Sequence, residues 1–328
     1  MALTATRRTD RDAPPGRGSG RRGEPARPRA SLRRRLWRER WMYLFIAPGL
    51  LFFVVLKYVP LLGNVIAFQD YSPFLGFGGS PWVGLANFAA MFTDPELGTA
   101  LKNTLVLSLL QIVVAFPAPI ALALLLNSLI STRVKRIIQS VVYLPHFIGW
   151  VIVVSIWQEV LGGGGVVSEV LQRFGAGPID LMSNPDTFPM LVTSQVIWKE
   201  IGWGTIIFFA AITMISTQLY ESAAVDGAGP WRRMWHVTLP GMSTVIVLLL
   251  ILRLGTVLTV GFEQLLLQQT MVGSDAALVL DTFTYYRGVV AGDWGLATAA
   301  GLVKGVVGTL LVVAANRFAK RMGGEGIL

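Results

Sequence analysis

The sequence predicts an all-α membrane protein that crosses the bilayer six times, and three observations support this fold class. The 328 residues are 53% hydrophobic and only 14% charged, whereas soluble domains carry about 25% charged residues. The apolar residues gather in runs that are long enough to span a bilayer, which takes about 20 residues of helix. Basic residues are concentrated in every second connection between these runs, as expected when cytoplasmic loops carry the Lys and Arg.

Six apolar stretches are the predicted spans. They cover residues 41–59, 104–126, 137–161, 190–215, 242–267 and 294–315. Pro117 and Pro119 interrupt the second stretch and should kink its helix. The longest gap, residues 61–103, is rich in Gly, Pro and aromatic residues, which predicts a structured surface loop with short helices. None of the gaps has room for a soluble domain.

The N-terminal segment differs from the rest of the chain in charge. Residues 1–40 hold 13 Arg and four acidic residues, whereas the remainder has 15 basic and 15 acidic residues. This composition predicts a disordered cytoplasmic tail near anionic lipid rather than a nucleic-acid-binding face. The predicted organisation is therefore a tail over residues 1–40 and a transmembrane domain over residues 41–328.

The orientation follows from the short connections. Lys and Arg follow the second, fourth and sixth spans, at Arg133, Lys135, Arg136, Arg232, Arg233, Arg317, Lys320 and Arg321. The opposite connections carry mainly acidic residues. The bias predicts a multi-pass protein of the cytoplasmic membrane with both termini in the cytoplasm.

Several kinds of chemistry are absent from the sequence. The chain has no Cys and only two His, which excludes thiolate sites and makes a metal site unexpected. No Lys precedes a Ser or Thr, so the chain has no phosphate-binding loop ending in Gly-Lys-Ser/Thr. It also has no Gly-x-Ser-x-Gly motif. We therefore expect neither an enzyme nor a bound cofactor or metal.

A polar passage, ESAAVDGAGPWRRMWHVTLP, separates the fourth and fifth spans. It predicts a short helix that stops at Gly227 and a second helix that starts at Pro230, a residue suited to the first helical turn. Trp231 and Trp235 are four residues apart and should share a face. The residues alone permit an interfacial helix pair held at the membrane surface.

The spacing of this passage resembles a known loop. Glu221-Ser222-Ala223, three residues, Gly227, nine residues and Val237-x-Leu239-Pro240 are similar to the EAA loop of permease subunits in type I binding-protein-dependent ABC importers. Ser222 and Val237 depart from that pattern by small changes. The resemblance implies a six-helix permease fold whose loop, residues 219–240, is a cytoplasmic coupling helix. The implied ATPase-coupling residues are Glu221, Ser222, Ala223, Asp226, Gly227, Leu239 and Pro240.

Other strings, such as WVGLANF, YLPHFIGW and WKEIGWGTIIFFAAIT, resemble the carbohydrate branch of this family over residues 44–328. The resemblance implies import of an oligosaccharide or related carbohydrate by alternating access. It implies as partners a second, different permease chain, a cytoplasmic ATPase dimer that binds ATP and Mg, and an extracytoplasmic substrate-binding protein. No nucleic acid is expected.

Polar side chains inside the predicted spans are the candidates for a substrate path. A charge at mid-bilayer costs about 2.5–3.5 kcal/mol on insertion scales, so such side chains should face protein or water. The candidates are Gln195, Trp198, Glu200, Trp203, Arg253 and Glu263. Structural roles are the alternative: Arg253 could pair with Glu200 or with the second permease, and the Trp residues could be interfacial anchors.

Three other functions stay open from the sequence. The chain could be a permease for a non-sugar solute in the same importer class. It could be an ATP-independent secondary transporter, although the loop spacing argues against this. It could also be a membrane sensor or scaffold without flux.

Overall fold

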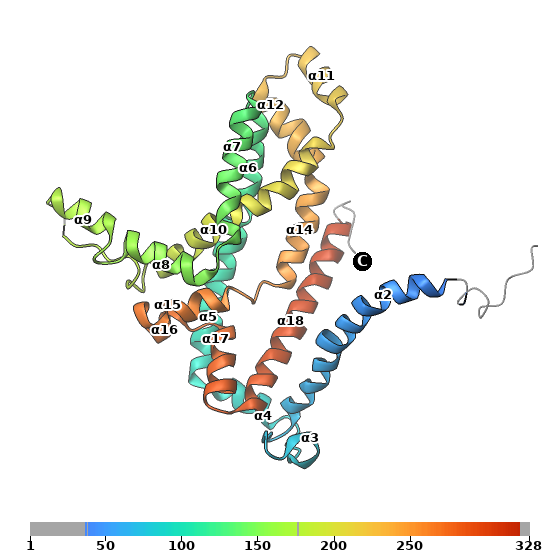
Figure 1. Cartoon of the computed structure of the whole chain (residues 1–328), viewed down its shortest axis with the longest axis vertical. Helices are drawn as coiled ribbons and strands as arrows, with labels where there is room; N and C mark the ends of the chain where they lie inside the picture. The colour runs from blue at the N-terminus through green and yellow to red at the C-terminus, as the bar shows by residue number, and fades with distance from the viewer. Residues whose placement is uncertain (1–36, 38, 176, 322–328) are drawn as a thin grey trace, which may run out of the picture. The chain divides into compact units, whose positions relative to one another are not determined.

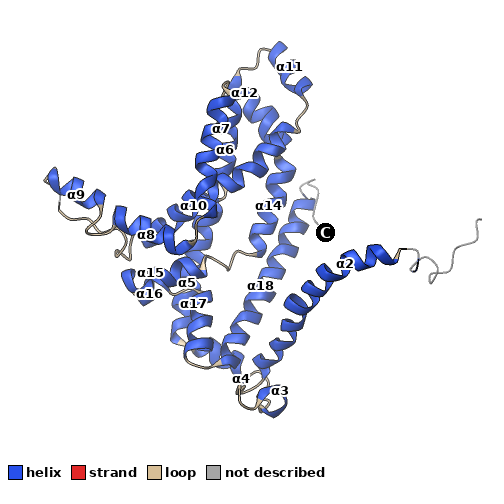
Figure 2. Cartoon of the chain, in the orientation of Figure 1, coloured by secondary structure: helices blue, strands red, loops and turns tan. Residues whose placement is uncertain are grey.

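The computed structural model describes residues 37, 39–175 and 177–321, and their regular structure is helical apart from one isolated β-bridge between Gln69 and Trp82 (Figure 2). The predicted tail, residues 1–40, lies outside the described residues except at Trp37, Glu39 and Arg40. The chain divides into two units, residues 1–60 and 61–328.

The first unit contains the first apolar helix. α2 (Arg40–Phe53) continues into a π-helical stretch, Val54–Tyr58, and a 3-10 helix, Val59–Phe68, leads on into the second unit. No residue of α2 is buried in the protein. Its exposed apolar surface fits a bilayer-facing helix, and the helical segment extends beyond the predicted end near Val59.

The predicted surface loop contains α3 (Gly76–Gly79) and α4 (Ala86–Thr93). The second span then runs through α5 (Pro95–Leu110), a π-helix (Gln111–Ala115) and α6 (Pro117–Ser128). It starts earlier than predicted, because the Asp94 carboxylate accepts the Glu96 N–H at 2.9 Å and caps α5. The π-helix ends two residues before Pro117, which lacks an N–H group, so the predicted distortion lies in this part of the helix.

The prediction of one continuous third helix over residues 137–161 is wrong. α7 (Thr132–Tyr143) ends in a 3-10 turn (Leu144–Phe147), and α8 (Trp150–Leu161) starts after Gly149. Pro145 lies in the turn and cannot donate a helical hydrogen bond. α9 (Val166–Arg173) follows α8.

Two long helices match the fourth and sixth predicted spans. α10 (Phe188–Thr213) agrees with its prediction within two residues, and α18 (Trp294–Arg321) continues six residues beyond its predicted end. α10 packs against α5, α6, α7, α14 and α15. A Cβ atom at Gly202 would lie 2.0 Å from the Val142 carbonyl oxygen, so glycine permits the close approach of α10 to α7.

The predicted fifth helix, residues 242–267, is also interrupted. α14 (Ser243–Gly255) ends before a non-helical segment, and α15 (Phe262–Val272) starts after it. Gly261 has φ +110°, which removes the segment from helical geometry. The chain continues through α16 (Ser274–Ala277), α17 (Leu280–Tyr285) and a π-helix (Tyr286–Val290) to α18.

Among the described residues, five segments are long and apolar enough to cross a bilayer: Arg40–Phe68, Pro95–Ser128, Trp150–Arg173, Phe188–Thr213 and Trp294–Arg321. A sixth results if Pro230–Gly241 and Ser243–Gly255, bent by 58°, count as one span. The predicted all-α polytopic fold is confirmed.

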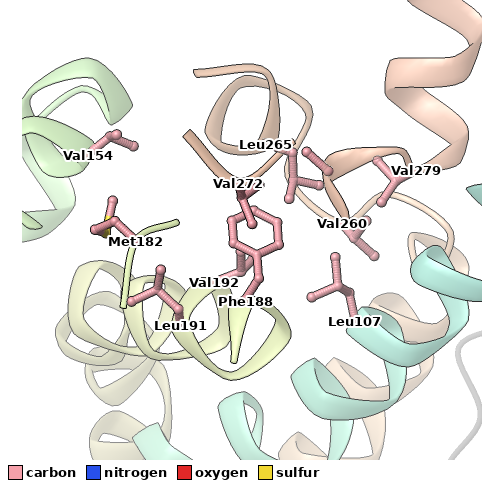
Figure 3. Packing of buried hydrophobic residues seen from close by; sticks show 11 residues of the cluster. Leu107, Val154, Met182, Phe188, Leu191, Val192, Val260, Leu265, Val272 and Val279 are labelled. Atoms are coloured by element: carbon pink, nitrogen blue, oxygen red, sulfur yellow. The ribbon is translucent and has the colours of Figure 1, made fainter. Parts of the chain in front are cut away.

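The largest buried apolar cluster lies where α5, α8, α10 and α15 meet (Figure 3). Phe188 of α10 points toward Val272 and Leu265 of α15 (Figure 3), and Phe188, Leu265 and Leu107 of α5 are almost fully buried. The interrupted fifth helix is thus packed into the second unit. In that unit, α11 and α12 lie at one end and α3 and α4 at the other (Figure 1).

Candidate functional site

The polar passage forms the predicted helix, bend and second helix. α11 (Thr217–Val225) is followed by α12 (Pro230–Arg233), a π-helix (Met234–Thr238) and α13 (Leu239–Gly241). Gly227 has φ +76°. Its N–H group bonds the Ala224 carbonyl at 3.1 Å, and the Ala228 N–H bonds the Ala223 carbonyl at 2.9 Å. This is the Schellman arrangement that ends a helix at a left-handed glycine.

The bend presents polar groups to solvent. Glu221, Ser222, Asp226 and Gly227 are exposed, and Ala223 is half-buried. In the described part of the chain, neither Glu221 nor Asp226 has an ion-pair partner within 4.0 Å. Both carboxylates can therefore contact another protein.

A hydrogen bond closes the base of the loop, and the chain then continues into α14. The Tyr220 hydroxyl and the buried Thr238 hydroxyl form a hydrogen bond of 3.0 Å across the loop. Leu239 is half-buried and Pro240 is exposed. The 58° bend then connects α13 to α14. Because α14 starts two residues after α13 ends, a movement of the loop would be transmitted directly to α14.

A polar cluster lies at the interruption between α7 and α8. Nδ1 of His146 donates to Oε2 of Glu200 at 2.7 Å, and the His146 ring stacks on Trp203 with centroids 4.5 Å apart. The buried Lys199 ammonium donates to the carbonyls of His146 and Ile148, both at 2.7 Å. Glu200 is half-buried and Trp203 is exposed, so this cluster joins the protein interior to accessible surface.

Gln195 lies in a different environment. Its amide is fully buried and bonds Gln264 and Gln268 of α15 at 2.6 and 3.0 Å. In this conformation Gln195 fastens α10 to α15 and reaches no accessible surface. Trp198 is 37% exposed and packs edge-on against Trp157 at 6.4 Å.

Arg253 contacts neither Glu200 nor any other carboxylate in the described ranges. Its guanidinium donates to the Gln111 amide oxygen instead. The Gln111 amide nitrogen donates to the Val260 carbonyl at 3.1 Å, and the Ser108 hydroxyl donates to the Val257 carbonyl. Glu263 is exposed in the first turn of α15. The pairing of Arg253 with Glu200 considered from the sequence is not formed.

The chain matches a family profile described as binding-protein-dependent transport system inner membrane component over residues 115–324. The chain belongs to this family. It is a family of transport components rather than enzymes, and the match agrees with the apolar helices of a multi-pass inner-membrane protein.

Curated relatives and solved structures agree with this assignment. This inner membrane component is 47% identical over 294 residues to the polygalacturonan/rhamnogalacturonan transport system permease protein YteP of Bacillus subtilis (strain 168), covering 89% of this chain and 92% of the relative. It is 27% identical to the arabinooligosaccharides transport system permease protein AraP of the same organism, covering 87% of this chain and 90% of that relative. A solved bacterial alginate ABC transporter, in complex with an alginate pentasaccharide-bound periplasmic protein, matches with a TM-score of 0.82. Its sequence is 34% identical, and the match covers 91% of this chain and all of that chain.

Sequence reasoning did not predict the contacts that hold the two interruptions. Ser108 and Gln111 lie inside the second predicted span, and neither they nor His146 is among the candidate site residues. A polar residue inside a span is the signal that could have indicated them, because such a side chain needs a partner in the membrane.

Proposed function

We propose that this chain is the permease subunit of an ABC importer that carries an oligosaccharide or related carbohydrate across the cytoplasmic membrane. The observation that supports this most strongly is the loop formed by α11, the bend at Gly227 and α12. This loop is exposed, so another protein could dock on it, and its residue spacing resembles that of the EAA loop. The names of the relatives, which include polygalacturonan and arabinooligosaccharide permeases, support the carbohydrate class.

The loop over residues 219–240 is the proposed contact with a cytoplasmic ATPase dimer, which binds ATP and Mg. Glu221 and Asp226 supply exposed charge, and Gly227 sets the bend. Ser222 and Ala223 complete the surface, and Leu239 and Pro240 carry motion into α14. Closure of the ATPase dimer would then move the loop and switch the helices between outward and inward access.

The proposed path for the carbohydrate runs past Trp203, Glu200 and Arg253. An indole ring can stack on the apolar face of a sugar, and carboxylate or guanidinium groups can bond its hydroxyls. Trp198 and Glu263, which are exposed in the single chain, stay candidates for the same path. Gln195 would join it only in another conformation.

The proposed assembly contains a second, different permease chain and an extracytoplasmic binding protein. The family description and the periplasmic protein in the matching structure support a binding-protein partner. The Lys and Arg bias supports cytoplasmic termini. The composition of the tail suggests that residues 1–30 are dispensable for transport, provided that Arg33 to Arg40 are kept.

A second candidate is import of a non-sugar solute by a permease of the same importer class. Permeases for sn-glycerol-3-phosphate from Salmonella are 32% identical over 67% of this chain. A secondary transporter is disfavoured, because such a protein needs no ATPase-docking loop.

The test is transport by the complete complex in ATP-loaded proteoliposomes. We expect binding-protein-dependent uptake of an oligosaccharide that requires ATP, and uncoupling by Glu221→Ala without loss of membrane insertion. Uptake that continues without ATP would indicate a secondary transporter. Uptake of glycerol-3-phosphate but not oligosaccharide would favour the second candidate.

A further inference from the structure

The predicted fifth span, which starts at residue 242 at the cytoplasmic side, places Arg253 deep in the bilayer. Arg253 follows Ser243, the first residue of α14, by ten positions, which is about 15 Å along a helix and half the thickness of a bilayer core. The residue is half-buried. A cation at this depth needs an acceptor, since the guanidinium is always charged.

Three other buried or half-buried cations, Lys199 of α10, Arg287 in the π-helix before α18 and Lys304 of α18, already have strong acceptors. Lys304 forms an ion pair with Asp281, and Arg287 forms one with Asp94 at 2.7 Å. Lys199 is held by two backbone carbonyls and lies 3.7 Å from Glu200. Arg253 differs, because its acceptor within the described ranges is the neutral amide of Gln111.

Gln111 also fixes where the guanidinium points. Its amide oxygen accepts from Arg253, while its amide nitrogen donates to the carbonyl of Val260 in the interruption after α14. Ser108 holds the same interruption through Val257. Arg253 is therefore a cation anchored beside a helix break, and within the part of the chain that the structure describes one of its five N–H donors is engaged in a hydrogen bond.

We propose that Arg253 binds the carboxylate of an acidic saccharide, so that the substrate supplies the missing counter-ion during passage. This inference rests on the proposed function. A guanidinium presents its donors in a planar fork that matches a carboxylate, and such bonds are about twice as strong as neutral ones. Two of the similar proteins are named for polymers of acidic sugars, polygalacturonan and alginate.

The probes are trigalacturonate and its methyl ester, which share length and linkage but differ in charge. Initial uptake is measured in proteoliposomes with the complete complex. For each probe, the uptake by a variant is divided by the uptake by the unmodified complex. Because the binding protein is the same in both complexes, its own selectivity between the probes cancels in this ratio. Arg253→Gln should lower uptake of the acid about tenfold or more and uptake of the ester much less. Arg253→Lys should keep most of the preference for the acid.

Lys304→Gln is the matched control, because it removes a cation that already has a carboxylate partner. It should change uptake of both probes by the same factor. Equal losses for both probes in Arg253→Gln would overturn the proposal. A complex that assembles with Lys but not with Gln at position 253 would also overturn it, since the charge would then serve a protein carboxylate. If the unmodified complex takes up a neutral oligosaccharide but neither probe, the acidic-saccharide inference fails and the proposed function stands. If it takes up no carbohydrate at all, the proposed function fails.

Discussion

Gly227 shows how much of the loop geometry depends on one residue. Its φ of +76° lies in the left-handed region, yet a Cβ atom built on it would meet no atom within 4 Å. The constraint is therefore conformational and not steric, and it costs an L-residue about 1–2 kcal/mol. The glycine of the resembled loop pattern occurs at the position where the backbone needs it.

Gly227→Ala should leave membrane insertion intact and reduce the coupling of ATP hydrolysis to uptake, because the bend would relax from its left-handed geometry. The measurement is the ratio of uptake to ATPase activity in proteoliposomes. Gly229→Ala is the control: Gly229 is two residues away, has φ −67° and also has open space. Equal coupling ratios in the two variants would show that the bend is not used for coupling.

At the scale of the elements, the positions of the two long continuous helices, α10 and α18, were predictable from the sequence. The interruptions in the third and fifth predicted spans were not. α10 and α18 are long apolar helices whose positions follow from hydropathy. The interruptions before α8 and before α15 depend on partners far away in the sequence. Lys199 donates hydrogen bonds to the backbone of the first interruption, and Ser108 and Gln111 donate to the backbone of the second. A window of local hydropathy contains no information on these pairings.

The same limit applies to the candidate site. The loop was predictable because its glycine, prolines and spacing are local signals. The acceptor of Arg253 was not, because Gln111 is 142 positions away and its amide resembles many others in the sequence. Gln195 was chosen for its polarity, but the structure uses its amide to join two helices.

Lys199→Met should destabilise the interruption between α7 and α8, since it leaves the carbonyls of His146 and Ile148 without their donor. An unsatisfied buried polar group costs about 1–3 kcal/mol, so we expect a Tm lowered by about 5 °C in detergent. Lys102→Met removes an exposed Lys and should leave Tm unchanged. Similar Tm values for both variants would mean that the ammonium does not stabilise the turn.

At the scale of the second unit, connections predicted to face the same side of the membrane do meet. The C-terminal part of α6 and the coupling loop line one cavity of about 580 Å³, formed by residues that include Leu125, Trp231 and Met234. At the other end, Asn103 donates to the carbonyls of Asp275 and Leu278. The connections thus separate into two groups, as a bilayer between them requires.

The orientation of these two groups can be tested directly, because the chain has no Cys. Ser128→Cys, in the group that includes the coupling loop, should react with a membrane-impermeant maleimide only after the cells are opened. Ser183→Cys, in the connection between α9 and α10, should react in intact cells. Both serines are exposed in the chain, so reactivity reports the side of the membrane. The Lys and Arg bias gives this direction, since cytoplasmic connections retain basic residues. The reverse labelling pattern would place Glu221 outside the cell, where no ATPase could dock, and would reject both the orientation and the coupling role.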